Sequence, residues 1–243
     1  MPRVLRVTAA QFPDFARAPN IADNQATYEL ENEAIDPSGA LWRALRDERD
    51  WSGRSLLDLG CGTGFWLPRY ATGPGAAARV IGVEPDPVLR AEALRRSPDV
   101  EVLAGSAEHL PLPDGSVDVV HARFAYFFPP DCEPGLREVL RVLRPGGALV
   151  VIDNDWRNGE FAELLSGSPW AQPQGSALST DSWWEQHGAR RTEVMSSWRC
   201  RDESELEAVL RIEFPAELVD GWTHRNPGRR EIGCGYVLFT VAL

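Results

Sequence analysis

The sequence predicts an α/β fold in which a parallel β-sheet is covered by helices on both faces. From Ser55 onward, short apolar runs rich in β-branched residues alternate with helix-prone segments. These runs are apolar at consecutive positions, as expected for strands buried between two layers of helices. In such sheets, ligands bind at the carboxyl ends of the strands. Unusual residues occupy those ends: Asp58, Gly60, Glu84, Ser106, residues 121–123 and residues 153–155.

The expected elements follow the chain in order. Residues up to about Asp50 are polar and helix-prone, with one interruption at Pro37-Ser38-Gly39, which indicates a helical cover. The expected strands are residues 55–60, 79–84, 100–105, 117–123, 148–153 and 235–243. The expected helices include residues 87–96, 133–143 and 202–214. Between Trp156 and Trp198 the chain is rich in Pro, Gly, Ser and Trp, and no separable second domain is indicated.

Composition excludes several functions. The formal net charge is −11 and the pI is near 4.9, which argues against binding to nucleic acid or to an anionic membrane surface. All 25 basic residues are arginine. Without lysine the chain cannot form a Schiff base, hold pyridoxal phosphate through a lysine, or build a standard phosphate-binding loop.

The cysteines and the N-terminus indicate a cytoplasmic protein. Cys61, Cys132, Cys200 and Cys234 are far apart and form no CxxC pair, so neither a zinc site nor a disulfide framework is expected. The first residues lack the basic stretch and apolar core of a signal peptide. No apolar run approaches the roughly 20 residues of a membrane span.

The stretch "LLDLGCGTGFW", residues 56–66, suggests a nucleotide or nucleoside site. A dinucleotide fold needs GxGxxG, but Phe65 or Leu67 replaces its third glycine in the two possible registers. What remains is DxGxGxG, formed by Asp58, Gly60, Gly62 and Gly64. A tight strand-to-helix turn without a ligand is the alternative. Glu84 ends the next strand, at the offset where an acid meets ribose hydroxyls in both nucleotide classes.

Four successive segments carry a family resemblance. They are "LLDLGCGTGFWLPRYA", "VIGVEPDPVLRAEA", "VLAGSAEHLPLPDGSVDVVHAR" and "LREVLRVLRPGGALVVID", which together span residues 56–153. Their order and spacing resemble class I S-adenosylmethionine-dependent methyltransferases, especially the small-molecule branch with the ubiquinone and menaquinone biosynthesis enzymes. The resemblance implies a three-layer, Rossmann-like, seven-stranded and mostly parallel sheet whose last strand is antiparallel.

The resemblance also implies how the chain is divided. Residues 1–50 would be the helical N-terminal cover and residues 51–155 the S-adenosylmethionine-binding core. Residues 156–243 would supply a variable acceptor-pocket segment and the last strands of the same domain. In related enzymes the N-terminal cover closes over the cofactor, and Tyr28 is a candidate contact; core packing is the alternative for this ring.

By the same resemblance, the glycine loop holds the methionine half of S-adenosylmethionine. Asp58 and the loop through Gly62 and Gly64 would bind it, with the backbone of Gly60 and Cys61 near its amino group. The backbone of His121 would contact the methionine half from the fourth strand.

By the resemblance, residues at the ends of the next two strands bind the nucleoside half of S-adenosylmethionine. Glu84 would accept hydrogen bonds from both ribose hydroxyls, and Pro85 and Asp86 would flank the adenine. Ser106 stands where the family usually has an aspartate that accepts from the adenine amino group, so serine gives a weaker, uncharged contact. Backbone groups of Ala107 and Glu108 could compensate.

Methyl transfer is an in-line displacement that needs positioning first, and a base only if the acceptor must lose a proton. The candidate catalytic residues are His121, Tyr126, Asp153, Asp155 and His187. For each, a structural role is the alternative. "IDND" is similar to the magnesium-binding Asp-Asn of catechol methyltransferases, but the aspartate those enzymes carry after the fourth strand is missing here. No metal is therefore expected.

The expected acceptor is a small, partly apolar organic molecule, and the protein is expected to be a monomer or a homodimer. Aromatic residues on the expected acceptor side suggest an apolar pocket: Phe124, Tyr126, Phe127, Phe128, Trp156, Trp170, Trp183, Trp184 and Trp198. A catalytically silent methyltransferase-fold binding protein is the main alternative. A nicotinamide-dependent oxidoreductase is disfavoured by the missing third glycine.

Overall fold

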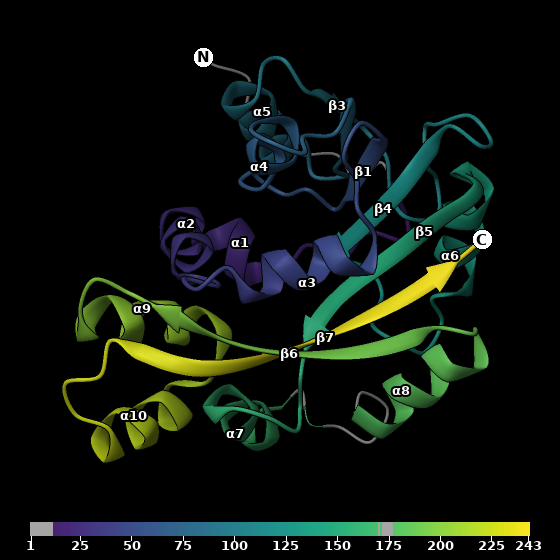
Figure 1. Cartoon of the computed structure of the whole chain (residues 1–243). Helices are drawn as coiled ribbons and strands as arrows, with labels where there is room; N and C mark the ends of the chain where they lie inside the picture. Colours follow the sequence, from purple (N-terminus) through teal and green to yellow (C-terminus); the bar gives the residue numbers. More distant parts are fainter. Residues whose placement is uncertain (1–11, 170, 172–176) are drawn as a thin grey trace.

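The core of the molecule is one seven-stranded sheet with the order β3-β2-β1-β4-β5-β7-β6 (Figure 1). The computed structural model describes residues 12–169, 171 and 177–243. The strands are β1 (Ser55–Leu59), β2 (Arg79–Val83), β3 (Glu101–Leu103), β4 (Val117–Arg123), β5 (Leu143–Asn154), β6 (Arg190–Arg199) and β7 (Glu231–Ala242). Only β7 runs antiparallel to its neighbours β5 and β6. The expected Rossmann-like, mostly parallel sheet with an antiparallel last strand is confirmed.

Helices cover both faces of this sheet. They are α1 (Pro19–Asp23), α2 (Gln25–Ala34), α3 (Ala40–Glu48), α4 (Leu67–Ala71), α5 (Pro87–Arg96), α6 (Glu133–Val142), α7 (Glu160–Gly167), α8 (Ala177–Gln186), α9 (Glu203–Glu213) and α10 (Ala216–Arg225). α3, α4 and α5 share a buried core with one face of the sheet, whereas α6 and α8 share a second core with the other face.

Side chains alternate between the two faces of the sheet along each strand, and this determines which residues face which helices. Leu56 and Val119 belong to the core under α3 and α4, whereas Leu57 and Val120 belong to the core under α6. Successive side chains of a strand point to opposite faces. Asp58 pairs in register with His121, so both lie on the α3 and α4 face. Arg123, two residues beyond His121, lies on that face as well.

Two parts of the sheet differ from the sequence expectation. β6 carries charged and polar residues at most positions and showed no separate strand signal, yet it pairs with β7 from Arg190 to Arg199. β5 starts at Leu143 rather than at Ala148, because the Pro145-Gly146-Gly147 turn lies inside it. Residues 144–147 loop out between Leu143, which pairs with Val117, and Ala148, which pairs with Val119.

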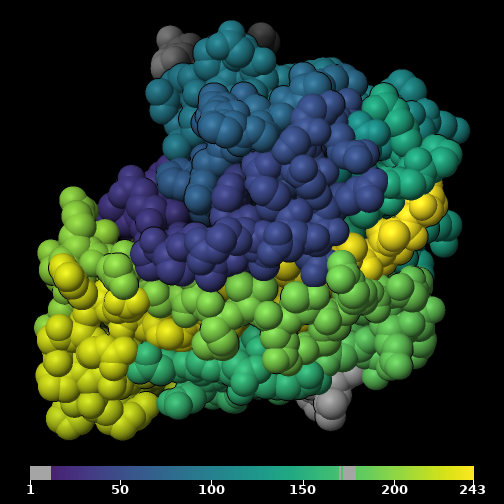
Figure 2. All heavy atoms as spheres, viewed as in Figure 1, coloured from purple at the N-terminus to yellow at the C-terminus, as the bar shows by residue number. Residues whose placement is uncertain are grey.

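The N-terminal helices lie between the core and the C-terminal segments. In Figure 2 the purple and blue atoms of this region form a band between the blue-teal core above and the green and yellow C-terminal part below. Asp36 fixes the start of α3 by accepting hydrogen bonds from the amides of Leu41 and Trp42, and it also accepts from Ser196 of β6. The cover is therefore attached to both parts of the fold.

Candidate functional site

The glycine loop follows β1 and turns sharply. Gly60, Gly62 and Gly64 have φ angles of +71°, +57° and +73°, a region that glycine adopts without strain. The amides of Gly60 and Cys61 both donate to the carbonyl oxygen of Val83, at 2.9 and 3.2 Å. These amides are thus engaged with β2. An ammonium group is itself a donor and needs acceptors, and the candidates here are the carbonyl oxygens of the loop and the carboxylate of Asp58.

Helix α4, which follows this loop, is shorter than a ligand-binding helix. It spans five residues, Leu67–Ala71, and its N-cap residue Trp66 makes no side-chain capping bond. The N-terminus of a helix can interact favourably with a carboxylate. The structure offers too short a helix for that role, so the loop and its neighbouring side chains must provide the binding groups.

Glu84 joins the first two loops of the site. Its Oε2 accepts from the amide of Gly62 and its Oε1 from the amide of Asp86, both at 2.9 Å. Burial raises the pKa of this carboxyl to about 7, and the two amides partly offset the rise. Each carboxylate oxygen has two lone pairs, so both can still accept from a ligand hydroxyl. The position fits the expected ribose-binding role.

Asp58 is the least satisfied polar group of the site. Its side chain is 1% exposed, and neither carboxylate oxygen has a hydrogen-bond partner among the described residues. Burial raises the pKa of Asp58 to about 6, and the positive charge of Arg123 counteracts this rise. A buried carboxylate without a partner is costly. An ammonium group of a ligand would satisfy it, so the donor set fits the amino-acid half of the expected cofactor.

The groups expected around the adenine have protein partners. Asp86 caps α5 by accepting from the amides of Val88 and Leu89. The hydroxyl oxygen of Ser106 lies 3.4 Å from Nδ1 of His109. The backbone amide of Glu108, the expected compensating donor, donates to Asp14 at 3.3 Å. The adenine-binding roles remain proposals.

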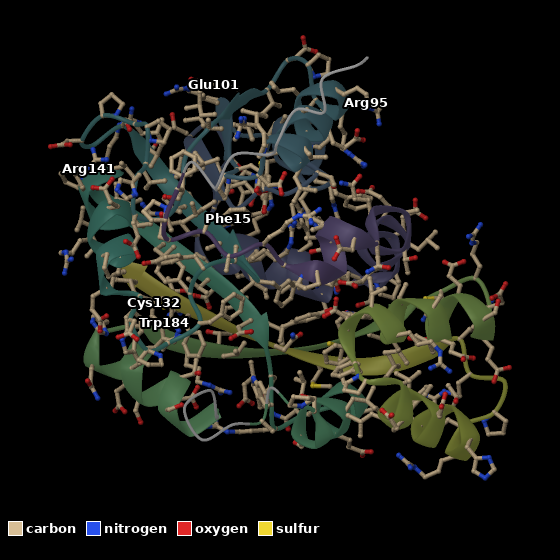
Figure 3. The ribbon with its side chains drawn as sticks, turned by 180° about the vertical axis from the view of Figure 1, so that it is seen from behind. Phe15, Arg95, Glu101, Cys132, Arg141 and Trp184 are labelled. Carbon is tan, nitrogen blue, oxygen red and sulfur yellow. The ribbon has the colours of Figure 1, made fainter. Side chains whose placement is uncertain are left out.

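An N-terminal segment, residues 14–29, reaches all three of these loops. Arg17 Nε lies 3.7 Å from Asp86, and a Cβ on Gly62 would lie 3.1 Å from Cδ1 of Ile21. Thr63 donates a 2.6 Å hydrogen bond to Glu29. Phe15 of this segment lies near the middle of the molecule in Figure 3. Sequence reasoning named only Tyr28 in this cover, because no local pattern indicates which residues of a separate segment reach a distant loop.

His121 is a core residue. Its side chain is fully buried between Trp51 and Tyr70, and its Nδ1 lies 3.1 Å from the Tyr70 hydroxyl. Burial and the charge of Arg123 lower the pKa of His121 to about 3. This position favours packing over general-base catalysis, because a base must reach the acceptor.

Tyr126 and His187 are also held in structural positions. The Tyr126 hydroxyl donates to Glu108 and accepts from the Gly135 amide, at 2.9 and 3.0 Å. The Nδ1 of His187 lies 2.7 Å from the carbonyl oxygen of Trp183, within its own helix region. Arg190, the first residue of β6, pairs with Thr240 of β7, which in turn pairs with Val150 of β5. His187 precedes Arg190 and therefore lies toward the amino edge of the sheet. The glycine loop lies at the opposite, carboxyl edge.

Asp155 and Asp153 follow β5 but differ in their surroundings. Asp155 is 2% exposed and accepts from the Arg157 amide and the Asn158 side chain, which fits the structural role considered as the alternative. Asp153 accepts only from the neighbouring Asn154 amide among the described residues, and desolvation raises its pKa to about 6. Asp153 is thus the candidate base whose carboxylate is least engaged.

The expected aromatic pocket is divided by the structure. Phe127, Trp183, Trp184 and Trp198 are buried in the two cores, because each packs against neighbouring rings or strands. Phe128 is 58% exposed. Trp170 lies outside the described residues. Phe124 and Trp156 are half-buried and pack against the core on the α3 and α4 face of the sheet, which is also the face that carries Arg123. These two rings are the members of the set that remain candidates for contact with an acceptor.

A buried acidic pair was missed from the sequence. Glu31 of α2 and Glu213 of α9 hydrogen-bond to each other, and Asn20 donates to Glu213 at 2.7 Å. Desolvation and their mutual repulsion raise the pKa of Glu31, and desolvation raises the pKa of Glu213. The two come from segments 182 positions apart, so only tertiary packing brings them together.

Comparisons with known proteins agree with this geometry. Residues 57–151 match the family model described as "Methyltransferase domain". A demethylmenaquinone methyltransferase from Lactococcus lactis is 37% identical over 46% of this chain and 48% of its own length. One from Beutenbergia cavernae is 32% identical over 67% of this chain and 60% of its own length. An S-adenosylmethionine-dependent methyltransferase structure from Thermotoga maritima has a TM-score of 0.57 at 18% identity, covering 91% and 95% of the two chains.

The family match identifies residues 57–151 as a methyltransferase domain, and the fold is that of class I S-adenosylmethionine-dependent methyltransferases, whose cofactor is S-adenosylmethionine. Several of the curated relatives that the chain resembles are demethylmenaquinone methyltransferases. The chain spans 31% to 60% of the length of four curated relatives that it matches.

Two negative observations on the described residues bear on metals and membranes. These residues contain no group of three or more His, Cys, Asp or Glu side chains placed to hold a metal ion. Within the same part of the chain, no helix combines the length and apolar character that a membrane crossing needs.

The affinity for S-adenosylhomocysteine, the demethylated cofactor, should rise with pH. Ribose hydroxyls and an ammonium group favour the ionised forms of Glu84 and Asp58, so binding lowers both raised pKa values and releases protons. Because protonation competes with binding, affinity should increase more than tenfold between about pH 5.5 and about pH 7.5. Isothermal titration calorimetry in buffers of different ionisation enthalpy would measure the affinity and the proton release. A pH-independent affinity would contradict these roles.

Replacing Glu31 with glutamine should change the pH dependence of stability. The folded pKa of Glu31 lies above its unfolded value, so the folded state binds the extra proton and loses stability as pH rises. The glutamine amide keeps a hydrogen-bond donor toward Glu213 without titrating. The melting temperature of Glu31→Gln relative to the wild type should therefore increase from about pH 5 to about pH 8. Glu33→Gln, exposed on the same helix, is the control and should show no such trend.

Proposed function

We propose that the protein transfers a methyl group from S-adenosylmethionine to a small, partly apolar organic acceptor. The carrying observation is the buried carboxylate of Asp58, unpartnered among the described residues, beside a glycine loop that Glu84 ties to the next strand end. This arrangement offers an acceptor for an ammonium group and acceptors for two hydroxyls on one edge of the sheet. The bound cofactor supplies an electrophilic methyl group on a sulfonium ion.

The residues of the chain contribute mainly position. Asp58 and Glu84 would fix the amino-acid end and the ribose of the cofactor, on either side of the sulfonium, which sets the direction in which the methyl group faces the acceptor. The N-terminal segment covers the loops and limits access of water. The half-buried rings of Phe124 and Trp156 support an apolar acceptor surface, and Asp153 is proposed as the group that would take a proton if the acceptor has one to lose.

Related properties follow from the same proposal. The acidic net charge supports a small-molecule acceptor rather than nucleic acid. The four cysteines are free and buried, which supports a cytoplasmic location. We retain residues 1–50, 51–155 and 156–243 as the cover, the cofactor core and the acceptor segment, in a monomer or homodimer.

The test combines binding with turnover. Calorimetry with S-adenosylhomocysteine should show binding to the intact protein, and incubation with methyl-labelled S-adenosylmethionine and fractionated small-molecule extracts should label one product. Asp58→Asn is the variant that should bind weakly and transfer slowly. Absence of binding would refute the site. Binding without a labelled product in any fraction would instead support a silent binding protein.

A further inference from the structure

Arg123 is a cation of the candidate site without a partner among the described residues. Its guanidinium makes no hydrogen bond or ion pair with any residue that the structure describes. It makes a cation–π contact with Trp66, in which the guanidinium carbon lies 4.5 Å from the ring centre. The side chain is half-buried rather than extended into solvent. An arginine fork can give a planar oxyanion two parallel hydrogen bonds, and stacking on an indole orients the fork beforehand.

The position of Arg123 relates it to Asp58. Asp58 is in register with His121, and Arg123 is two residues farther along β4 on the same face of the sheet. Arg123 therefore lies two residues closer to the carboxyl edge of the sheet than the position level with Asp58. The loop after β4 also meets the glycine loop there, since a Cβ on Gly60 would lie 2.6 Å from Cβ of Ala125. The cation and the unpartnered carboxylate thus flank the same turn.

We propose that Arg123 binds the α-carboxylate of the cofactor's amino-acid half, while Asp58 binds its α-ammonium group. This inference rests on the proposed function and adds to it a recognition residue. A zwitterionic amino acid carries one positive and one negative group a few bonds apart. The two opposite charges on one face of the sheet complement that pattern. Together they distinguish the full cofactor from a nucleoside thioether that lacks the amino-acid end.

The neighbouring acids do not neutralise Arg123. Glu31 and Glu213 hydrogen-bond to each other, and burial raises the pKa of both carboxyls. The positive charge of Arg123 counteracts the rise in pKa that burial causes at Glu31 and Asp58, but no carboxylate of the described residues lies within ion-pair distance of the guanidinium. The guanidinium is therefore available to a ligand carboxylate.

The experiment compares ligands with and without the amino-acid end. Wild type, Arg123→Gln, Arg123→Lys and the control Arg95→Gln are titrated with S-adenosylhomocysteine, its decarboxylated amine and 5′-methylthioadenosine. Arg95 is an exposed arginine of α5 at the outer surface in Figure 3. Arg123→Gln should bind S-adenosylhomocysteine at least about tenfold more weakly than wild type, with binding of the two carboxylate-free ligands changed less than about twofold. Arg123→Lys should be intermediate.

The outcomes separate this inference from the function it rests on. Failure of the wild type to bind S-adenosylhomocysteine would overturn the cofactor site itself. Equal weakening for all three ligands would show that Arg123 acts only through folding, and would overturn the carboxylate role. Unchanged binding of every ligand, with a raised KM for the methyl acceptor, would assign Arg123 to an acidic group of the acceptor instead and overturn the proposal. Arg123→Lys provides the folded variant if Arg123→Gln unfolds.

Discussion

Glu84→Ala should weaken S-adenosylhomocysteine binding about 100-fold. Hydrogen bonds to a charged acceptor contribute about 1.5 to 3 kcal/mol each, and about 1.4 kcal/mol corresponds to a tenfold change in affinity. The substitution removes the acceptor for the ribose hydroxyls. It also leaves the buried amides of Gly62 and Asp86 without their common partner, which loosens the glycine loop and the start of α5.

The measurement is a calorimetric titration of folded protein. Glu101→Ala is the matched control, since Glu101 starts β3 at the surface, as Figure 3 shows, and its ion pair with Arg79 is an exposed contact. Its affinity should differ from wild type by less than about twofold, as expected for an exposed ion pair. A loss below about fivefold for Glu84→Ala would contradict the ribose-binding role.

Gly64→Ala should destabilise the fold more than alanine at a glycine with a similar backbone. Gly64 has a φ of +73°, and a Cβ there would lie 2.9 Å from Cα of Ala93 in α5. The strain of a left-handed conformation costs about 1 to 2 kcal/mol, and displacing a packed helix adds about 1 to 3 kcal/mol. The melting temperature should fall by on the order of 10 °C, because 1 kcal/mol corresponds to roughly 2–4 °C at this chain length.

Gly228 isolates the conformational part of this effect. Its φ is +74°, and nothing lies within 4 Å of a Cβ built on it. Gly228→Ala should therefore lower the melting temperature by only about 2–8 °C. Equal shifts for Gly64→Ala and Gly228→Ala in scanning calorimetry would show that close contact with α5 is not what requires glycine at position 64.

The role of Gly64 also explains why one argument from the sequence was incomplete. A dinucleotide motif needs a third glycine for close packing of helix on strand, and Phe65 and Leu67 lack it. In this chain, Gly64 makes a close approach of that kind, but to α5, the helix after the next strand. The spacing argues against the dinucleotide motif. It could not show that a glycine two positions after Gly62 serves packing as well as turning.

The candidate site was only partly predictable. Asp58, the glycines and Glu84 follow directly from strand ends, because parallel strands bring their carboxyl ends to one edge. His121 and Tyr126 also follow strand ends, but their side chains face a tryptophan–tyrosine cluster and helix α6. Arg123 stood in the same motif without an assigned role. The proposal that Arg123 binds a ligand depends on its guanidinium having no hydrogen-bond or ion-pair partner among the described residues, and only the folded structure shows this.

The α/β class, most strands of the sheet and the glycine loop follow from the amino-acid sequence alone, since these depend on local apolar runs and on glycine's backbone freedom. Tertiary structure decided the rest. β6 needs β7 beside it, because its own residues are largely polar and only one face is buried. The N-terminal segment over the loops, the Glu31–Glu213 pair and the relation of Arg123 to Asp58 join distant parts of the chain. Such contacts arise from packing and leave no periodic pattern in the sequence.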